Sequence, residues 1–193
     1  YTVLAMTAPE KKARGLSAFI VDRDTPGFSI GKIEQKMGIK ASDTAELILE
    51  NVRVPKENLL GKESKGFRYA LASIDDSRVS VGAGQALGIA EGAFDLAVKY
   101  SRERVQFGVP IGAQQGIQWY LAEMKTKIAA ARWLTYYAAW LVNQGKRVTE
   151  AGALAKLYAS QAAREVVNMA LQIHGGYGYM KDYPLERMYR DAK

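Results

Sequence analysis

The hydrophobic pattern of this chain changes its period near residue 66. Before that point, short segments rich in Val, Ile, Leu and Phe alternate with turn sequences, which is typical of strands. Four segments fit this description: TVLAM at 2–6, GLSAFIVDR at 15–23, FSIGKIEQ at 28–35 and AELILENVRV at 45–54. The sequence therefore predicts antiparallel β structure over residues 1–65.

Apolar residues at steps of three and four replace this pattern over residues 66–193. Helices are predicted at about 67–103, 114–144 and 149–174, and a short fourth helix is expected to begin near Tyr183 or Pro184. Gly145 stands where a C-terminal cap would end the second helix. The predicted fold class is α+β: a partial antiparallel β-domain at 1–65, followed by an antiparallel four-helix bundle at 66–193.

The helical spacing also predicts which side chains are buried. The expected core positions are Phe67, Leu71, Ile74, Val81, Leu87, Phe94 and Val98 in the first helix, Ile117, Leu121, Met124, Ile128, Ala131, Thr135, Ala138 and Val142 in the second, and Leu154, Tyr158, Ala162, Val166, Met169 and Ile173 in the third. Aromatic residues of the second helix are expected to fill the core and its edges rather than to form a stacking surface for a ring: Trp119, Tyr120, Trp133, Tyr136, Tyr137 and Trp140.

Composition excludes several kinds of site. The chain has no Cys and one His, so it offers neither a disulfide nor a plausible zinc site. Lys and Arg number 27 against 20 Asp and Glu, but the basic residues are scattered, which favours a small anionic ligand over nucleic acid or a membrane surface. No apolar stretch approaches the length of a membrane span, and the first residues do not resemble a signal peptide, so we expect a soluble protein.

Glycines at 175, 176 and 178 break the pattern that follows the third helix. They are not a phosphate-binding turn, because that motif follows a strand and opens a helix. One glycine is enough for a helix cap, and three suggest that another body approaches the backbone. Both interpretations remain open from the residues alone. The neighbouring His174 is expected to be a packed or capping residue.

Charged residues supply two further candidate binding sites. Asp75 and Arg78 can share a helix face and orient a phosphate-bearing ligand, or form an ordinary ion pair. Asp75 and Asp76 point in different directions, so they do not form a catalytic dyad. Arg104 precedes a helix break, where its guanidinium suits phosphate and Phe107 suits a flat ring, or where the arginine complements the helix dipole.

Four segments together resemble the acyl-CoA dehydrogenase family: KMGIKASDTAELILENVRVPKENLLG, DDSRVSVGAGQALGIAEGAFDLAVKYSRERVQFGVPI, QQGIQWYLAEM and QIHGGYGYMKDYPLERMYRDAK. The resemblance implies the latter part of a middle β-domain and most of a C-terminal bundle, without the N-terminal helical domain. It also implies an FAD enzyme of fatty acid β-oxidation, which converts an acyl-CoA, here a short-chain or branched short-chain one, to the 2,3-enoyl-CoA and passes electrons to an electron-transfer flavoprotein.

The resemblance also implies roles for individual residues. The family's FAD is shared across a dimer interface within a homotetramer. The residues expected to contact it are Arg104, Val105, Gln106, Phe107, Gln114, Gln115, Gln172, Ile173, His174, Gly175 and Gly176. Asp75 and Arg78 correspond to substrate-binding positions. No catalytic residue is assigned, because the usual base is a Glu beyond Lys193 and the alternative position is Ser77, which is unable to remove an α-proton unaided.

The 193 residues alone are therefore expected not to turn over acyl-CoA. Three alternatives remain: an acyl-CoA oxidase, a flavin monooxygenase of the same fold, or a non-catalytic oligomerisation module. No metal is expected, and the bacterial cytoplasm is preferred to the mitochondrial matrix as the location.

Overall fold

A computed structural model describes residues 1–193 and divides the chain into two compact units. The first unit comprises residues 1–36 and 40–74, and the second comprises residues 37–39 and 75–193.

The first unit contains two antiparallel strand pairs. Strand β1 (Thr2–Met6) pairs with β2 (Leu16–Ile20), and β3 (Phe28–Ile33) pairs with β4 (Ala45–Leu49). A 3-10 segment, Pro9–Gly15, joins the first pair, and a second 3-10 turn, Lys56–Asn58, follows β4. The prediction of four antiparallel strands is confirmed, since turn residues separate the segments where the chain reverses.

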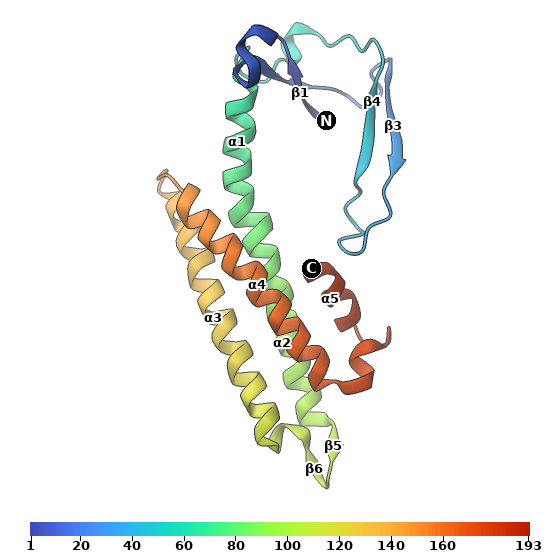
Figure 1. Ribbon diagram of the computed structural model, residues 1–193, viewed down its shortest axis with the longest axis vertical. Helices are drawn as coiled ribbons and strands as arrows, with labels where there is room; N and C mark the ends of the chain where they lie inside the picture. The colour runs from blue at the N-terminus through green and yellow to red at the C-terminus, as the bar shows by residue number, and fades with distance from the viewer. The chain divides into compact units, whose positions relative to one another are not determined.

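Helices form the second unit. They are α1 (Gly66–Ser77, whose first nine residues belong to the first unit), α2 (Gln85–Glu103), α3 (Gln115–Asn143), α4 (Thr149–Ile173) and α5 (Leu185–Ala192). Helices α2, α3 and α4 run side by side, with α5 beside α4 (Figure 1). A hairpin of β5 (Val105–Gln106) and β6 (Val109–Pro110) joins α2 to the 3-10 turn Ile111–Ala113, which leads into α3. Gly145 follows α3 with φ of 64°, as expected of a cap.

The predicted first helix is not a single α-helix. A π-helical segment, Arg78–Gly84, separates α1 from α2. It packs against α4: a Cβ added to Gly82 would lie 2.9 Å from Cγ of Lys156, and one added to Gly152 would lie 3.3 Å from Cγ2 of Val79. Apolar spacing alone does not reveal a π-helical turn, because the residues remain on roughly the same face.

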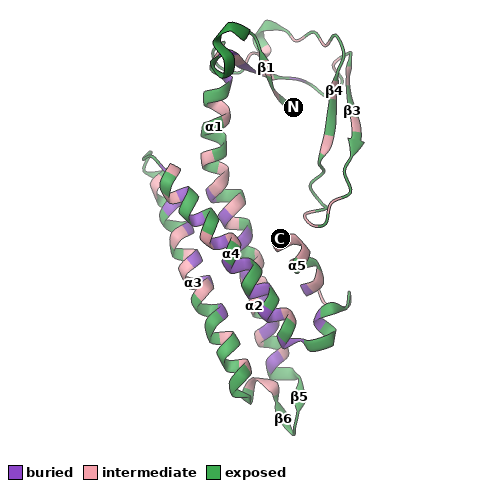
Figure 2. Cartoon of the chain, in the orientation of Figure 1, coloured by how far each residue is buried: buried purple, intermediate pink, exposed green.

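Alanine forms much of the bundle core. Buried positions recur along α2, α3 and α4 (Figure 2). Helix α2 buries alanines at steps of three and four, and α4 supplies matching alanines: Ala86, Ala90, Ala93, Ala97, Ala155, Ala159, Ala163 and Ala170. Larger side chains, including Met124, Ile128 and Leu185, fill the remaining space. Small residues let the helix axes approach closely, so the core has little room for aromatic rings.

Several expected core residues are exposed. The prediction that the α3 aromatics fill the core is wrong, because five of the six are well exposed and the sixth, Tyr120, is 38% exposed. The six residues are Trp119, Tyr120, Trp133, Tyr136, Tyr137 and Trp140. Burial was also wrongly predicted for Phe67, Leu71, Ile74, Val81, Val142 and Leu154. The other expected positions of α3 and α4 are buried or partly buried.

Residues Met37–Ile39 belong to the second unit because they dock on α5. The amide of Ile39 donates to Oδ1 of Asp191 over 2.7 Å, and Nη1 of Arg190 donates to the carbonyl of Met37 over 2.9 Å. A Cβ on Gly38 would lie 2.3 Å from the carbonyl oxygen of Arg190. Only glycine permits this contact between the two backbones.

Candidate functional site

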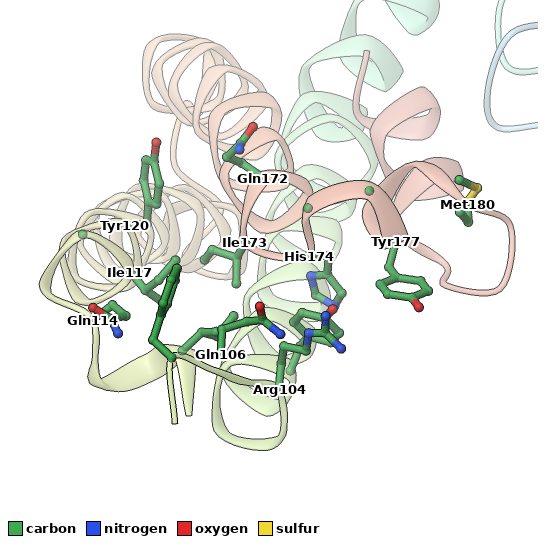
Figure 3. Close-up of a pocket in the computed structure, with 16 residues that line it drawn as sticks. Arg104, Gln106, Gln114, Ile117, Tyr120, Gln172, Ile173, His174, Tyr177 and Met180 are labelled. Carbon is green, nitrogen blue, oxygen red and sulfur yellow. The ribbon is translucent and has the colours of Figure 1, made fainter. Parts of the chain in front are cut away.

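The second unit contains a hollow with a volume of about 760 Å³. It lies between the C-terminal ends of α2 and α4, the start of α3 and the residues that follow α4 (Figure 3). Segments separated by up to 80 positions therefore meet at one end of the bundle. The lining residues are Tyr100, Arg104, Gln106, Phe107, Ile111, Gln114, Gly116, Ile117, Tyr120, Gln172, Ile173, His174, Gly175, Gly176, Tyr177 and Met180.

Arg104 is the one charged residue that lines the hollow. It is the residue at which α2 ends: its amide still donates to the carbonyl of Tyr100, but its ψ of 119° turns the chain into the hairpin. Its guanidinium lies 5.9 Å from the ring centroid of Tyr177, and no carboxylate pairs with it. A guanidinium with its donors directed into an open hollow is suited to phosphate or another oxyanion.

Three rings, those of Tyr100, His174 and Tyr177, line the hollow beside Arg104, and the ring of Tyr183 packs against all three. Tyr100 stacks on His174 with centroids 4.1 Å apart, and Tyr183 packs edge-on against both rings. The ring centroid of Tyr177 lies 6.1 Å from that of Tyr183, and the guanidinium of Arg104 lies over the face of Tyr177. Burial raises the pKa of Tyr100, while Arg104 opposes the shift. These rings present flat apolar surface next to the arginine, and the face of Tyr177 favours a guanidinium above it.

The three glycines that follow α4 have three different surroundings. Gly175 has φ of 57°, a left-handed conformation that glycine adopts without strain. A Cβ on Gly178 would lie 2.5 Å from the carbonyl oxygen of Leu171, so this glycine is required by packing. Gly176 has neither property, and a Cβ there would meet nothing within 4 Å. The fold explains two glycines and leaves Gly176 as bare backbone facing open space.

Phe107 is also unexplained by the fold. It occupies the tip of the hairpin with φ of 56°, and its side chain is 94% exposed. A left-handed conformation is unfavourable for a phenylalanine, and an exposed ring gains nothing from burial. The side chain therefore has no stabilising role within this chain.

Most residues expected to contact a cofactor lie together around this hollow. Val105 and Gln115 are the exceptions and do not line it. Arg104, Gln106 and His174 lie on one side, and Gln114, Ile117 and Tyr120 lie on the other (Figure 3). Tyr100, Tyr177 and Met180 also line the hollow and were not predicted from the sequence. A four-residue step back from Arg104 along α2 identifies Tyr100, because residues i and i+4 share a face.

Asp75 and Arg78 lie elsewhere. Arg78 is separated from Arg104 by 26 residues of nearly continuous helix, roughly 40 Å. Nη1 of Arg78 donates to Oδ1 of Asp75 over 2.8 Å, and the hydroxyl of Thr149 donates to Oδ2 over 2.8 Å. Asp75 thus joins the end of α1 to the start of α4, and it orients a guanidinium that is partly exposed.

The hollow is built for binding rather than for acid–base chemistry. It contains no carboxylate, and its one histidine hydrogen-bonds a backbone carbonyl. No cluster of His, Asp or Glu is arranged to hold a metal ion. None of the helices combines the length and apolar character that crossing a membrane requires. A phosphate-bearing ligand with a flat ring or polar hydroxyl groups fits these surroundings.

Comparison with known proteins gives a consistent result. The family model described as "Acyl-CoA dehydrogenase, C-terminal domain" matches residues 64–193, and "Acyl-CoA dehydrogenase, middle domain" matches residues 1–52. The chain is 63% identical to an acryloyl-CoA reductase (NADH) of Anaerotignum propionicum, over 99% of the chain and 48% of the relative.

Two solved structures are also similar. Butyryl-CoA dehydrogenase from Megasphaera elsdenii matches with a TM-score of 0.96 and 50% identity, over 100% of this chain and 50% of that one. A chain in a structure described as the electron transferring flavoprotein of Acidaminococcus fermentans matches with a TM-score of 0.96 and 56% identity, over the same shares. The chain spans about half the length of these relatives.

Proposed function

The chain belongs to the acyl-CoA dehydrogenase family, and we propose that the whole protein is an FAD-dependent acyl-CoA dehydrogenase. Its substrates would be short-chain or branched short-chain thioesters, and the short-chain assignment is supported by similar proteins named acryloyl-CoA reductase and butyryl-CoA dehydrogenase. The observation that carries the proposal is the hollow that joins the unpaired Arg104 guanidinium to the bare backbone of Gly176.

The residues of the hollow fit part of an FAD molecule. The Arg104 guanidinium would hold the pyrophosphate, and the open backbone at Gly176 would permit close approach of the adenosine end. Amide side chains of Gln106, Gln114 and Gln172 offer both donors and acceptors to polar groups. Bound FAD would supply the acceptor for the hydride that leaves the β-carbon of the thioester. Val105 and Gln115 remain proposed contacts along the same cofactor.

Substrate would lie near the pair formed by Asp75 and Arg78. Asp75 is already bound on both oxygens, so its role would be to orient Arg78 toward a polar group of the thioester. Ser77 adjoins the pair and is too weak a base for an α-proton. From the resemblance to the family, we propose that the base is a Glu that would follow residue 193 in the whole protein.

The direction of the reaction is a second question. The 63% identity to a protein named as a reductase favours an alternative in which the same site reduces a short enoyl-CoA. The chain's residues would bind and orient the thioester in the same way in both directions. The electron donor or acceptor outside this chain would then decide which direction dominates.

We also propose the partners expected for such an enzyme. The electron acceptor would be an electron-transfer flavoprotein, an assignment supported by the similar chain from Acidaminococcus fermentans. The assembly would be a homotetramer in which the hollow contacts FAD bound mainly by a second subunit. The exposed tip at Phe107 is consistent with such a shared site. The proposed location is the bacterial cytoplasm.

The test is anaerobic titration of the purified whole protein with acyl-CoA thioesters of graded length and branching. We expect one bound FAD per subunit and bleaching of its absorbance by three- to five-carbon thioesters. Absence of flavin, with the oligomer intact, would refute the proposal in favour of a non-catalytic module. Rapid reoxidation of the reduced flavin by oxygen would instead identify an oxidase or monooxygenase. Oxidation of NADH on addition of acryloyl-CoA would support the reductive direction.

A further inference from the structure

We propose that His174 is a positioning residue of the hollow, whose neutral imidazole accepts a hydrogen bond through Nε2 from a hydroxyl or amino group of the bound nucleotide. The inference rests on the proposed function, because that nucleotide is FAD. It assigns a particular atom, a particular tautomer and a pH dependence to a site that otherwise depends on Arg104 and the glycine backbone.

The ring of His174 is fixed by its neighbours. Nδ1 lies 2.9 Å from the carbonyl oxygen of Ala170, and a carbonyl only accepts, so the Nδ1 atom carries the proton. Tyr100 stacks on one face at 4.1 Å with planes 21° apart, and Tyr183 packs edge-on at 5.3 Å. These contacts prevent the ring from turning over. In the neutral ring, Nε2 therefore carries a lone pair.

Nε2 reaches the hollow although the residue is only 3% exposed. Every fully buried side-chain nitrogen or oxygen has a hydrogen-bond partner, and Nε2 has none, so this atom lies at the surface of the hollow. A nearly buried acceptor without a partner is unfavourable unless a ligand completes it.

The surroundings keep the imidazole neutral. The rings packed against it are Tyr100 from α2 and Tyr183 before α5, and Arg104 and Tyr177 line the same hollow. None of these is a carboxylate, and Arg104 already supplies a positive charge. Burial lowers the pKa of His174, and the hydrogen bond to the backbone opposes this shift only in part.

The two polar centres of the hollow have opposite requirements. Arg104 donates only and fits an oxyanion, while Nε2 of neutral His174 accepts only and fits a hydroxyl or amino group. A simple anion would satisfy the first group and leave the second unpaired. A nucleotide carries both kinds of group, so it satisfies both centres.

Two substitutions in the whole protein test this inference. His174→Phe keeps a stacking ring and removes the acceptor, and the carbonyl of Ala170 still receives the backbone amide of residue 174. His174→Gln provides an amide oxygen that accepts and does not titrate. The measurement is the FAD dissociation constant of the apoprotein, obtained by flavin fluorescence between about pH 5 and pH 8. Urea unfolding of each apoprotein reports whether the fold is retained.

At about pH 8 we expect His174→Phe to raise the dissociation constant about tenfold, and His174→Gln to raise it less. In the wild type the constant should be flat near neutrality and rise by up to tenfold per pH unit below the imidazole pKa. Both variants should lose this slope. Equal constants for the wild type and His174→Phe, or an equal slope in all three proteins, overturn the inference while leaving FAD binding intact. A wild type that binds no FAD overturns both the inference and the proposed function.

Discussion

A comparison of substitutions at Gly176 and Gly178 tests the function of the hollow most directly. The two residues are two positions apart in the same loop, yet their surroundings are opposite. Gly178 packs against the backbone of Leu171, whereas a Cβ on Gly176 would meet nothing. If the loop is only a helix stop, substitutions should matter in proportion to packing. If the loop binds a ligand, Gly176 should matter for affinity and not for stability.

The expected magnitudes follow from these distances. In Gly178→Ala the new methyl group would lie 2.5 Å from a carbonyl oxygen of α4, well inside van der Waals contact, so the free energy of unfolding should fall by about 1–3 kcal/mol. Gly176→Ala introduces no contact and no left-handed strain, so the free energy of unfolding should change by less than about 0.5 kcal/mol or rise slightly. Gly176→Leu adds bulk in the same open direction.

The assays are urea unfolding of the apoprotein, followed by circular dichroism, and FAD affinity, followed by flavin fluorescence. We expect Gly176→Leu to weaken FAD binding by at least tenfold with near-normal stability, and Gly178→Ala to show mainly a loss of stability. Parallel losses of stability and affinity in both variants would refute the reasoning, and the loop would then be a structural cap alone.

Other substitutions separate the core, the anion site and the pH response. Met124→Ala, at a fully buried position, should lower the free energy of unfolding by about 2–5 kcal/mol, while Trp133→Ala, at a side chain 77% exposed, should change it by less than about 1 kcal/mol in the same urea assay. Arg104→Lys should weaken FAD binding while unfolding stays near wild type, because no carboxylate of the hollow pairs with the guanidinium; unchanged affinity would contradict its assignment to phosphate. Burial lowers the pKa of His174 below 6.5, so the unfolded chain takes up a proton first as pH falls. The free energy of unfolding should therefore decrease below about pH 6.5, and urea titrations of His174→Phe should lack this component.

Local chemistry made the secondary structure predictable. Turn residues separate the strands, and Gly145 ends α3 with the expected left-handed φ. The π-helical turn at Arg78–Gly84 was not predicted, because it changes hydrogen bonding without moving the apolar residues to another face. Exposure of the α3 aromatics was missed for a different reason. Periodicity identifies a helix face, but only tertiary packing reveals that a core built of alanine excludes large rings.

The candidate site, too, was predictable from the sequence only in part. Resemblance to a family identified Arg104 and the Gln172–Gly176 loop, and the structure brings them to one hollow. The second partner of Asp75 is Thr149, 74 positions away, which no local pattern indicates. The unpartnered Nε2 of His174 is equally invisible in the sequence, since it depends on a ring fixed by Tyr100 and by Ala170.

Three features at this end of the bundle have no explanation within the chain itself. Phe107 holds an unfavourable φ with its ring in solvent, Gly176 leaves backbone bare, and His174 presents an acceptor without a donor. Each is mildly unfavourable for an isolated bundle, and folding gains nothing from any of them. All three lie around Arg104, whose guanidinium also lacks a counter-charge in the hollow. A single bound molecule that carries phosphate, a flat ring and hydrogen-bond donors would satisfy all four at once, which is the physical basis for placing a nucleotide cofactor here.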